Sequence, residues 1–449
     1  MSSHVYKIYL MMPSCVPATP METSGAKILD NDINDYVHRY SDRIIGLGEM
    51  MNYGGVLSDD EEVLSKLLVV GYRPKDGHAP LLSAKSLNAY IVAGLGSDHE
   101  CSKLDEALEK LRKGMTQEKN LQALVPLINE FNSFKMSLVS DDRDPIDLKE
   151  NGHLDYLVRR AISYGVTPIR AIQMASINTA RYFRIKDQGA IAPEFRADFM
   201  LLDDLNSFKI SSVFIDGMEV GKNNSSGVIL EDYDYRSSTS DLLENTMRVK
   251  SLDNDYIFRI PGRGSWVQVI GVTPGQIITE KRILQAKLDD GFAVADPRRD
   301  IAKLVVIERH HKTGNVGLGF VQGLGIEKRA IVSSVAHDSH NLVVAGMSDS
   351  DMMVAARHIC SIGGGLSVAY NGQIIANLPL PIAGLMSDKP IELVIANVKT
   401  VNEACKILGN NVIRDPFMLL SFLSLTVIPS LKLTDKGLFD VDKFRLANL

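Results

Sequence analysis

Short apolar runs alternate with amphipathic stretches up to about residue 184. The runs at 6–12 and 43–47 predict buried strands, and the stretch at 30–40 between them predicts a helix. Apolar residues at 104–115 repeat at helical spacing. This alternation predicts a parallel sheet that binds its ligands at the carboxyl-terminal edge of the strands.

One segment breaks the alternation. Only the polar residues 116–119 stand between Met115 and Asn120, which leaves no room for the strand that a regular barrel would place there. We expect a second helix at 120–130 instead, and then a strand at 134–139. A later helix has Thr167 as its cap and Pro168 in its first turn, where proline is favoured.

The second half of the chain predicts a separate α/β domain. The stretch from 221 to 248 is polar and rich in Asn, Ser and Asp, as domain boundaries are. After it we expect strands at 304–308 and 331–335, and a helix at 349–362. The dipeptide Asn371-Gly372 indicates a β-hairpin.

Composition narrows the class of partner. The 449 residues carry a formal charge of −6 and a pI near 6.0, which disfavours nucleic acid because phosphate binding needs a basic face. Four cysteines without a C-x-x-C pair suit a reducing cytoplasm. We expect no signal peptide, and the apolar stretch 417–431 is shorter than the roughly 20 residues that span a bilayer. That stretch is expected to be buried in a core.

Four polar residues carry the main chemical signal. Each ends a short apolar run at a turn: Glu49, His78, His99 and Asp141. A (β/α) barrel assembles a metal site from carboxylates and imidazoles at successive strand ends. Such ligands suit zinc, iron or manganese, and a metal-bound carboxylate such as Asp141 can take a proton from water and pass it to a leaving amine.

Simpler interpretations stay open for each residue taken alone. Glu49 could be an ion-paired surface carboxylate, and His78 a surface residue in a loop poor in apolar neighbours. A surface salt bridge could explain one of the adjacent Asp141 and Asp142. The four strand-end positions together favour a functional cluster.

A second polar cluster lies in the segment 333–341. His337, Asp338 and His340 could bind substrate or metal, or internal hydrogen bonds could simply hold this loop, which is the interpretation that the sequence slightly favours. The glycines at 363–365 lack the strand–helix setting of a dinucleotide fingerprint and are expected to end the preceding helix.

Several long segments together resemble the bacterial-type adenine deaminases, a branch of the metal-dependent amidohydrolase superfamily. These segments are 12–26, 76–100, 140–162, 188–205, 333–346 and 378–387. The resemblance runs from about residue 6 to the carboxyl end and depends on more than one short motif.

The resemblance implies hydrolysis of adenine to hypoxanthine and ammonia at a binuclear manganese or iron site, as in purine salvage. It implies that Glu49 bridges the metals, that His78 and His99 are single ligands, and that Asp141 is a metal-bound acid/base. Glu100 would contact the purine or move protons. The loop with His337, Asp338 and His340 would bind substrate or close over the site. The expected assembly is a cytoplasmic homo-oligomer, with a dimer as one alternative.

The expected fold class is α/β, an incomplete (β/α)8 amidohydrolase barrel with a small β region and a separate α/β carboxyl-terminal domain. The expected divisions are a partial barrel at 1–185, the remnant of a small β region at 186–222, a linker at 223–250 and an adenine deaminase carboxyl-terminal domain at 251–449.

The chain departs from the family in one respect. Its ten histidines contain no His-x-His pair, which in the family supplies two metal ligands. We interpret the sequence as lacking the amino-terminal portion, through a truncated gene model, a split enzyme or a degenerate relative. The alternative function is a catalytically impaired purine-binding or oligomer-forming remnant.

Overall fold

The structure is a computed structural model that forms two compact units. The first comprises Met1–Cys15 and Ile28–Tyr233, and the second Val16–Lys27 and Asp234–Leu449. The residues that the structure describes are 7–101, 103–117, 121–222, 225–226, 243–250, 252–262, 264, 266–273, 276–326, 328–406 and 415–449.

Short parallel strands form the centre of the first unit. Three of them make a sheet in the order β1-β2-β3, and β4 pairs with β5. Their bounds are β1 Leu10–Pro13, β2 Ile44–Met50, β3 Lys75–Gly77, β4 Ser97–Asp98 and β5 Thr116–Gln117. This arrangement brings the carboxyl-terminal ends of β1, β2 and β3 to one edge.

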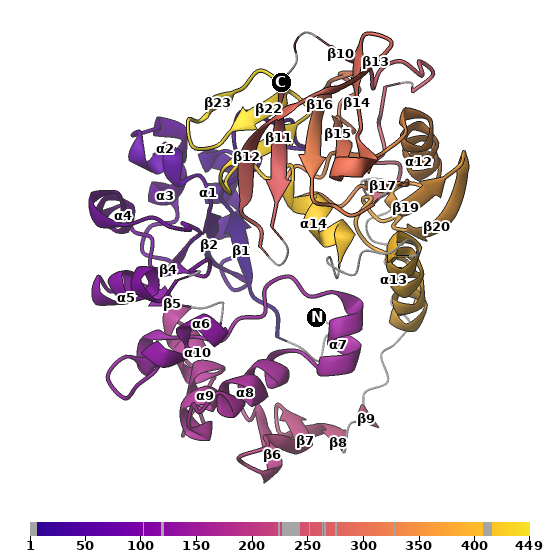
Figure 1. Ribbon diagram of the computed structural model, residues 1–449. Coiled ribbons are helices and arrows are strands. Elements are labelled where there is room, and N and C mark those ends of the chain that lie inside the picture. Colours follow the sequence, from indigo (N-terminus) through magenta and orange to yellow (C-terminus); the bar gives the residue numbers. More distant parts are fainter. Residues whose placement is uncertain are drawn as a thin grey trace. The chain divides into compact units, whose positions relative to one another are not determined.

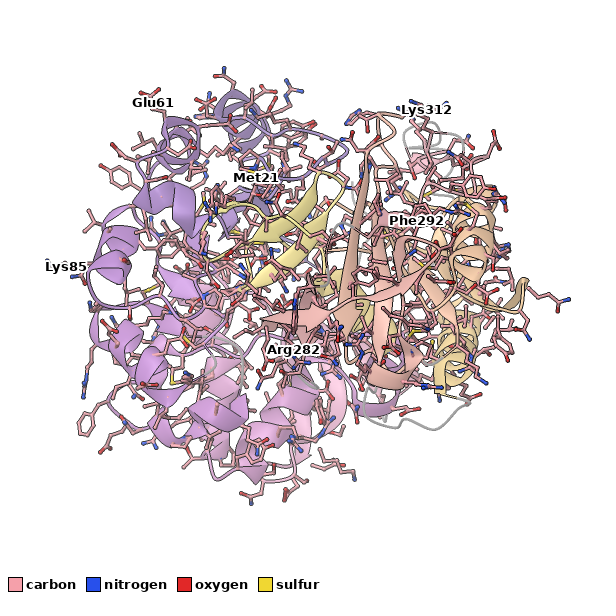
Figure 2. All side chains as sticks on the ribbon, turned by 45° about the horizontal axis from the view of Figure 1, so that its top comes forward. Met21, Glu61, Lys85, Arg282, Phe292 and Lys312 are labelled. Atoms are coloured by element: carbon pink, nitrogen blue, oxygen red, sulfur yellow. The ribbon has the colours of Figure 1, made fainter. Side chains whose placement is uncertain are left out.

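Helices alternate with these strands. Their bounds are α1 Asp30–Arg39, α2 Tyr53–Leu57, α3 Glu61–Val69, α4 Ala84–Val92, α5 Leu104–Arg112, α6 Leu121–Leu124, α7 Pro145–Asn151, α8 Leu154–Ser163, α9 Pro168–Met174 and α10 Ile177–Tyr182. In Figure 1 α3, α4 and α5 follow one another along one side of the strands. Glu61 and Lys85, each in the first turn of its helix, are exposed to solvent on the outside (Figure 2).

The polar segment after Met115 begins with a two-residue strand, β5. The expectation that no strand fits there was therefore wrong. Thr116 and Gln117 pair in parallel with Ser97 and Asp98, and the Thr116 N–H donates to the Gly96 carbonyl at 2.8 Å. Two residues suffice for this pairing. They are too few to show any hydrophobic period, which is why the pattern missed them.

Two neighbouring predictions were also wrong. The predicted helix at 120–130 is a single turn, α6, followed by the 3-10 helix Val125–Leu127, which contains a proline in its first turn. The predicted strand at 134–139 is not a strand. A 3-10 helix occupies Ser133–Lys135, and the Leu138 N–H donates to the Met174 carbonyl rather than to a sheet partner.

An antiparallel sheet completes the first unit. Its strands pair in chain order: β6 Phe199–Asp204, β7 Lys209–Ile215, β8 Met218–Lys222 and β9 Ser225–Ser226. Lys7 joins this sheet to the beginning of the unit, because its ammonium lies 2.6 Å from Asp198 and 2.9 Å from Asp216.

The second unit contains an eight-stranded sheet in the order β12-β11-β16-β15-β18-β17-β19-β20. The bounds are β11 Trp266–Val272, β12 Thr279–Gln285, β15 Ile301–Ile307, β16 Val316–Gln322, β17 Ala330–Ser333, β18 Leu342–Gly346, β19 Gly365–Tyr370 and β20 Gln373–Pro379. All pairs except β11 with β16 are antiparallel. β15 is buried along its whole length, as expected for a central strand.

Three helices pack on this sheet. α12 (Asp349–Ser361) contacts β17, β18 and β19, α13 (Ile391–Lys406) contacts β19 and β20, and α14 (Pro416–Phe422) contacts β17 and β18 (Figure 1). Met352, Ala356 and Ile359 of α12 are fully buried against the sheet. Smaller sheets flank this core: β10 Ile260–Pro261, β13 Lys287–Asp289 and β14 Phe292–Val294 form one, and β21 Leu431–Thr434, β22 Gly437–Asp440 and β23 Arg445–Leu446 form the other.

Several local predictions for the second unit are confirmed. The helix expected at 349–362 is α12, and Gly363 and Gly364 follow it with positive φ angles of 84° and 116°, as helix-ending glycines do. Asn371 and Gly372 form the turn between β19 and β20. The apolar stretch from 417 is buried in α14 and the residues after it.

Among the described residues, no helix combines the length and the apolar character that crossing a membrane demands.

Close packing of β16 against β21 gives a stability prediction. A Cβ at Gly317 would lie 1.8 Å from the Thr434 carbonyl oxygen, whereas a Cβ at Gly319 of the same strand would meet Leu433 at an ordinary 3.4 Å. G317A should lower the free energy of unfolding by about 2 kcal/mol, because the backbone must move. G319A should change it by less than about 0.5 kcal/mol. Urea unfolding of both variants measures the difference, and equal stabilities would contradict this packing.

Candidate metal centre

Three polar side chains stand at the carboxyl-terminal ends of neighbouring strands in the first unit. Glu49 is the second-last residue of β2, His78 directly follows β3, and His99 directly follows β4. Small residues allow these strands to come close. A Cβ at Gly46 would lie 2.3 Å from the Pro74 carbonyl oxygen, and one at Gly77 would lie 2.3 Å from the Ser97 carbonyl oxygen.

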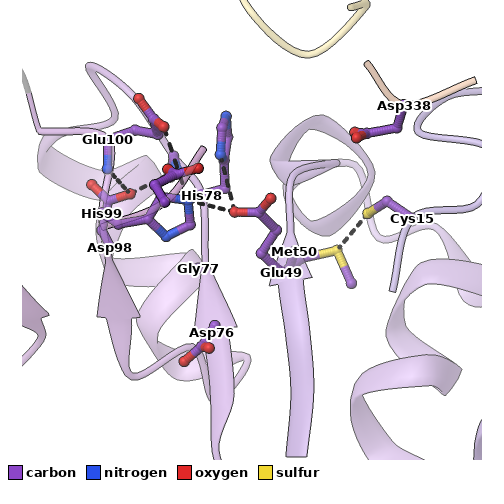
Figure 3. A network of polar contacts seen from close by, with 12 residues as sticks. Cys15, Glu49, Met50, Asp76, Gly77, His78, Asp98, His99, Glu100 and Asp338 are labelled. Atoms are coloured by element: carbon purple, nitrogen blue, oxygen red, sulfur yellow. Dashed lines mark hydrogen bonds and ion pairs between the residues drawn. The ribbon is translucent and has the colours of Figure 1, made fainter. Parts of the chain in front are cut away.

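The structure brings Glu49, His78 and His99 together. Glu49 Oε2 lies 2.5 Å from His99 Nε2 and 3.3 Å from His78 Nδ1 (Figure 3). The two imidazoles meet edge to face, with ring centroids 5.4 Å apart. One ligand atom from each of the three residues lies within 4.8 Å of those of the other two, which is close enough to hold one metal ion.

A second group of possible ligands shares His99 with the first. Atoms of His99, Glu100 and Asp141 also lie within 4.8 Å of one another, and Glu100 Oε1 is 3.9 Å from His99 Nε2. Asp141 has a left-handed φ of 51°, and its carboxylate accepts the Asp142 N–H at 2.6 Å. The structure therefore gathers all four predicted strand-end residues, and Glu100, around His99.

The contacts shift the pKa values of two of these groups. Burial alone would raise the pKa of Glu49, but hydrogen bonds and charge from His78 and His99 hold it well below its usual range. Burial alone would lower the pKa of His99, but the hydrogen bond and charge of Glu49 raise it to about 10. Both groups are thus stabilised in their charged forms by one another.

The donor set fits a divalent metal ion. His78 is 4% exposed, and its Nε2 is buried without a hydrogen-bond partner among the described residues. An unpaired buried nitrogen is costly unless something binds it. Two imidazoles and a carboxylate within ligand reach are a set that zinc, iron and manganese accept, and Glu100 and Asp141 lie next to His99.

Tyr90 supports the candidate ligands, and no pattern in the sequence marks it for this role. Its hydroxyl accepts the His78 N–H at 3.0 Å and donates to the Met50 carbonyl at 2.6 Å, so it links the ends of β2 and β3. The side chain is fully buried on the inner face of α4. Its helical spacing from Leu87 predicts burial, but nothing in the sequence shows which groups its hydroxyl meets.

Asp76 lies in β3, and its carboxylate points away from Glu49, His78 and His99 (Figure 3). Its carboxylate accepts hydrogen bonds from the Tyr182 and Ser97 hydroxyls at 2.7 and 3.0 Å. Burial raises its pKa above the ordinary value. Both bonds are accepted by Oδ1, so Tyr182 and Ser97 hold this carboxylate in place within the first unit.

The predicted substrate residues His337, Asp338 and His340 lie in the second unit. The His337 ring stacks on Phe422 with centroids 4.4 Å apart, and Asp338 Oδ2 is buried without a partner among the described residues. His340 Nδ1 accepts the Ala336 N–H at 3.2 Å, and burial lowers its pKa to about 4. Internal hydrogen bonds therefore do hold this loop, and its contacts with a purine stay a prediction.

Glu22 is a further buried acid, and it lies in the second unit. It is 2% exposed, and Oε1 accepts the Thr19 N–H and the Thr426 hydroxyl, both at 3.3 Å. Oε2 is buried and has no partner among the described residues. Burial raises the pKa of Glu22 to about 8. It lies in an irregular segment without periodicity, so no pattern marked it.

The strand-end side chains and the helices that alternate with the strands fit a metal-dependent amidohydrolase, and the comparisons with known proteins support this class. Residues 111–220 match the family model described as amidohydrolase family, and residues 276–445 match the model described as adenine deaminase C-terminal domain. Asp141 lies within the first match, whereas Glu49, His78 and His99 precede it. Their convergence is thus an observation independent of that match.

Curated relatives define the family more closely. The chain is 52% identical to the adenine deaminase of Oleidesulfovibrio alaskensis, over 98% of this chain and 77% of that protein. It is 45% identical to adenine deaminase 2 of Carboxydothermus hydrogenoformans, over 97% of this chain and 76% of that protein. The chain therefore belongs to the adenine deaminase family. The predicted family, fold class and class of enzyme are confirmed.

Solved structures give only weak likenesses. One is the β-aspartyl dipeptidase of Fervidobacterium islandicum, at 18% identity and a TM-score of 0.34, covering 45% of this chain and 62% of that one. Another is the N-acetyl-D-glucosamine-6-phosphate deacetylase of Mycobacterium smegmatis, at 15% identity and a TM-score of 0.36. This match covers 45% of this chain and 65% of that one. Neither carries further argument.

The raised pKa of Glu22 predicts how stability depends on pH. The folded protein keeps the Glu22 proton up to about pH 8, whereas the unfolded chain loses it near 4.5. This contribution to stability is full below pH 4.5 and is lost as pH rises towards 8, at about 1.4 kcal/mol per pH unit. E22Q has no proton to lose, so its stability relative to wild type should increase between pH 5 and 8 in urea unfolding.

E61Q is the control, because Glu61 is exposed on α3. Its stability relative to wild type should not change with pH. If the difference between E22Q and wild type is also constant across this range, Glu22 is not protonated in the folded protein.

Proposed function

We propose that this chain hydrolyses adenine to hypoxanthine and ammonia with a divalent metal ion held by Glu49, His78 and His99. The observation that supports this most directly is the convergence of these three residues within 4.8 Å of one another, next to Asp141 and Glu100. The substrate comes from the relatives, whose names give adenine deaminase.

The reaction replaces the amino group of adenine by oxygen. A C–O bond forms at C6 from water, the C6–N bond breaks, and the amino nitrogen leaves as ammonia. A divalent ion, when bound, supplies the positive charge that lowers the pKa of water towards neutrality and polarises the group under attack. Both effects favour attack near neutral pH.

The residues of the chain move the protons. Asp141 accepts the proton of the attacking water and passes it to the leaving amine, as a carboxylate next to the ligands can do. Glu100, 3.9 Å from His99, contacts the purine or relays the second proton. Together these groups return all protons to the products, so the cycle needs no other reactant.

Manganese or iron would suit a site of imidazoles and carboxylates. The four cysteines are free thiols, as expected in a reducing cytoplasm, which is where purine salvage would take place. A homo-oligomer, for example a dimer, is the assembly that we propose.

Ammonia release by the purified chain loaded with manganese tests this function. D141N should lower kcat by about 10²–10⁴-fold, since it removes the general base. D142N is the matched control, because its backbone N–H can still donate to Asp141. It should keep kcat within a few-fold of wild type.

Equal activity of D141N and wild type would contradict the role of Asp141. A wild-type chain that binds adenine but releases no ammonia would contradict the proposed reaction. That result would instead support the purine-binding alternative.

A further inference from the structure

α5 buries two charged residues on its inner face. Glu106 is 7% exposed and Lys110 is 0% exposed, and they lie beside the buried Ala107 and Leu111. The spacing of Glu106 and Lys110 predicts a helical i,i+4 pair, which such charges form on solvent-exposed faces. The pair exists, with 2.7 Å between Nζ and Oε1, but it is inside the protein.

The Lys110 ammonium donates three hydrogen bonds to three different segments. Its acceptors are Asp98 Oδ2 at 2.6 Å, Glu106 Oε1 at 2.7 Å and the Ala79 carbonyl oxygen at 2.8 Å. An ammonium has three protons, so these bonds use all of its donors. Ala79 directly follows His78, and Asp98 directly precedes His99.

The carboxylates of Asp98 and Glu106 also bind backbone N–H groups of the loops that follow β3 and β4. Asp98 Oδ1 accepts the Ala79 N–H at 3.0 Å and the Glu100 N–H at 3.3 Å. Glu106 Oε1 accepts the Leu81 N–H at 2.7 Å. The loop after β3 and the loop after β4 are therefore both attached to Lys110, directly or through one carboxylate (Figure 3 shows the Asp98–Glu100 contact).

The charges of this cluster stabilise one another. Burial alone would lower the pKa of Lys110, but Asp98 and the further hydrogen bonds hold it well above its usual range. Burial alone would raise the pKa of Asp98, but Lys110 lowers it. Removing one partner of a buried ion pair leaves an uncompensated charge, which is strongly destabilising.

A second metal site is the other interpretation of these residues. Ligand atoms of Asp98, Cys101 and Glu106 lie within 4.8 Å of one another, as a metal would require. However, the Lys110 ammonium already lies 2.6–2.7 Å from both carboxylates and supplies the positive charge. The cluster is therefore complete without an ion.

We propose that Lys110 is a positioning residue for the metal centre, which fixes the relative placement of His78 and His99 by holding the two loops that carry them. This inference rests on the proposed metal site. Groups that orient metal ligands typically change metal affinity by about 10–100-fold when they are removed.

Cobalt(II) titration of the whole chain tests this, because its visible absorption bands report both affinity and coordination geometry. K110M should bind Co²⁺ about 10–100-fold more weakly than wild type, with shifted bands. K113M is the matched control. Lys113 also forms an i,i+4 pair on α5, with Glu109 at 3.0 Å, but that pair is partly exposed and Lys113 donates to residues of α4 instead of the ligand loops. Its affinity and spectrum should match wild type.

Hydrogen exchange of the metal-free protein gives a second readout. The Ala79 and Leu81 amides donate to Asp98 and Glu106, which Lys110 fixes in place. In K110M these amides should exchange about tenfold faster or more, because local opening costs less. In K113M they should exchange as in wild type.

A third variant separates positioning from folding. E106Q/K110M keeps the net charge of the cluster, since it removes one positive and one negative charge, and the side-chain amide oxygen that it places at position 106 can still accept the Leu81 N–H. It should fold with a cooperative transition and still bind Co²⁺ weakly.

Three results would contradict the proposal. A folded K110M or E106Q/K110M chain with wild-type Co²⁺ affinity and spectrum would show that Lys110 does not position the ligands. If neither variant folds, the cluster serves folding alone. If wild type itself binds no Co²⁺, the proposed metal site fails, and that failure is distinct from the first two.

Discussion

The contact of one Glu49 oxygen with two imidazoles is the interaction on which the site depends. It requires β2, β3 and β4 to end close together, and the close approaches at Gly46 and Gly77 allow this. Without a metal, Glu49 and His99 compensate one another's charge, as their opposite pKa shifts indicate. The site is therefore held in a ligand-ready arrangement by the same groups that would bind the ion.

Buried polar groups behind the ligands maintain this arrangement. Tyr90 connects the ends of β2 and β3, and Lys110 connects the loops after β3 and β4. Each of these groups is buried and has its hydrogen bonds satisfied, so each resists displacement of a ligand loop. A site assembled from four separate segments needs such links, because the strands themselves are only two to seven residues long.

The sequence predicted the parts of the structure that local pattern determines. α1, α5, α12 and the turn at Asn371-Gly372 follow from periodicity and turn chemistry, and Glu49, His78 and His99 were identified because polar residues end apolar runs. What it could not show depends on partners distant in the chain. The burial of Lys110 is one example, since its acceptors come from two other segments. Another is the strand at Thr116–Gln117, which exists only through its pairing with β4.

The most direct test of the central claim is the position of a bound ion. An anomalous difference map from a manganese-soaked crystal should show a peak within about 2.0–2.3 Å of the ligand atoms of Glu49, His78 and His99. A peak at any other group of residues, or a map with no peak near Glu49 at saturating manganese, would contradict the claim that these three side chains form the metal centre.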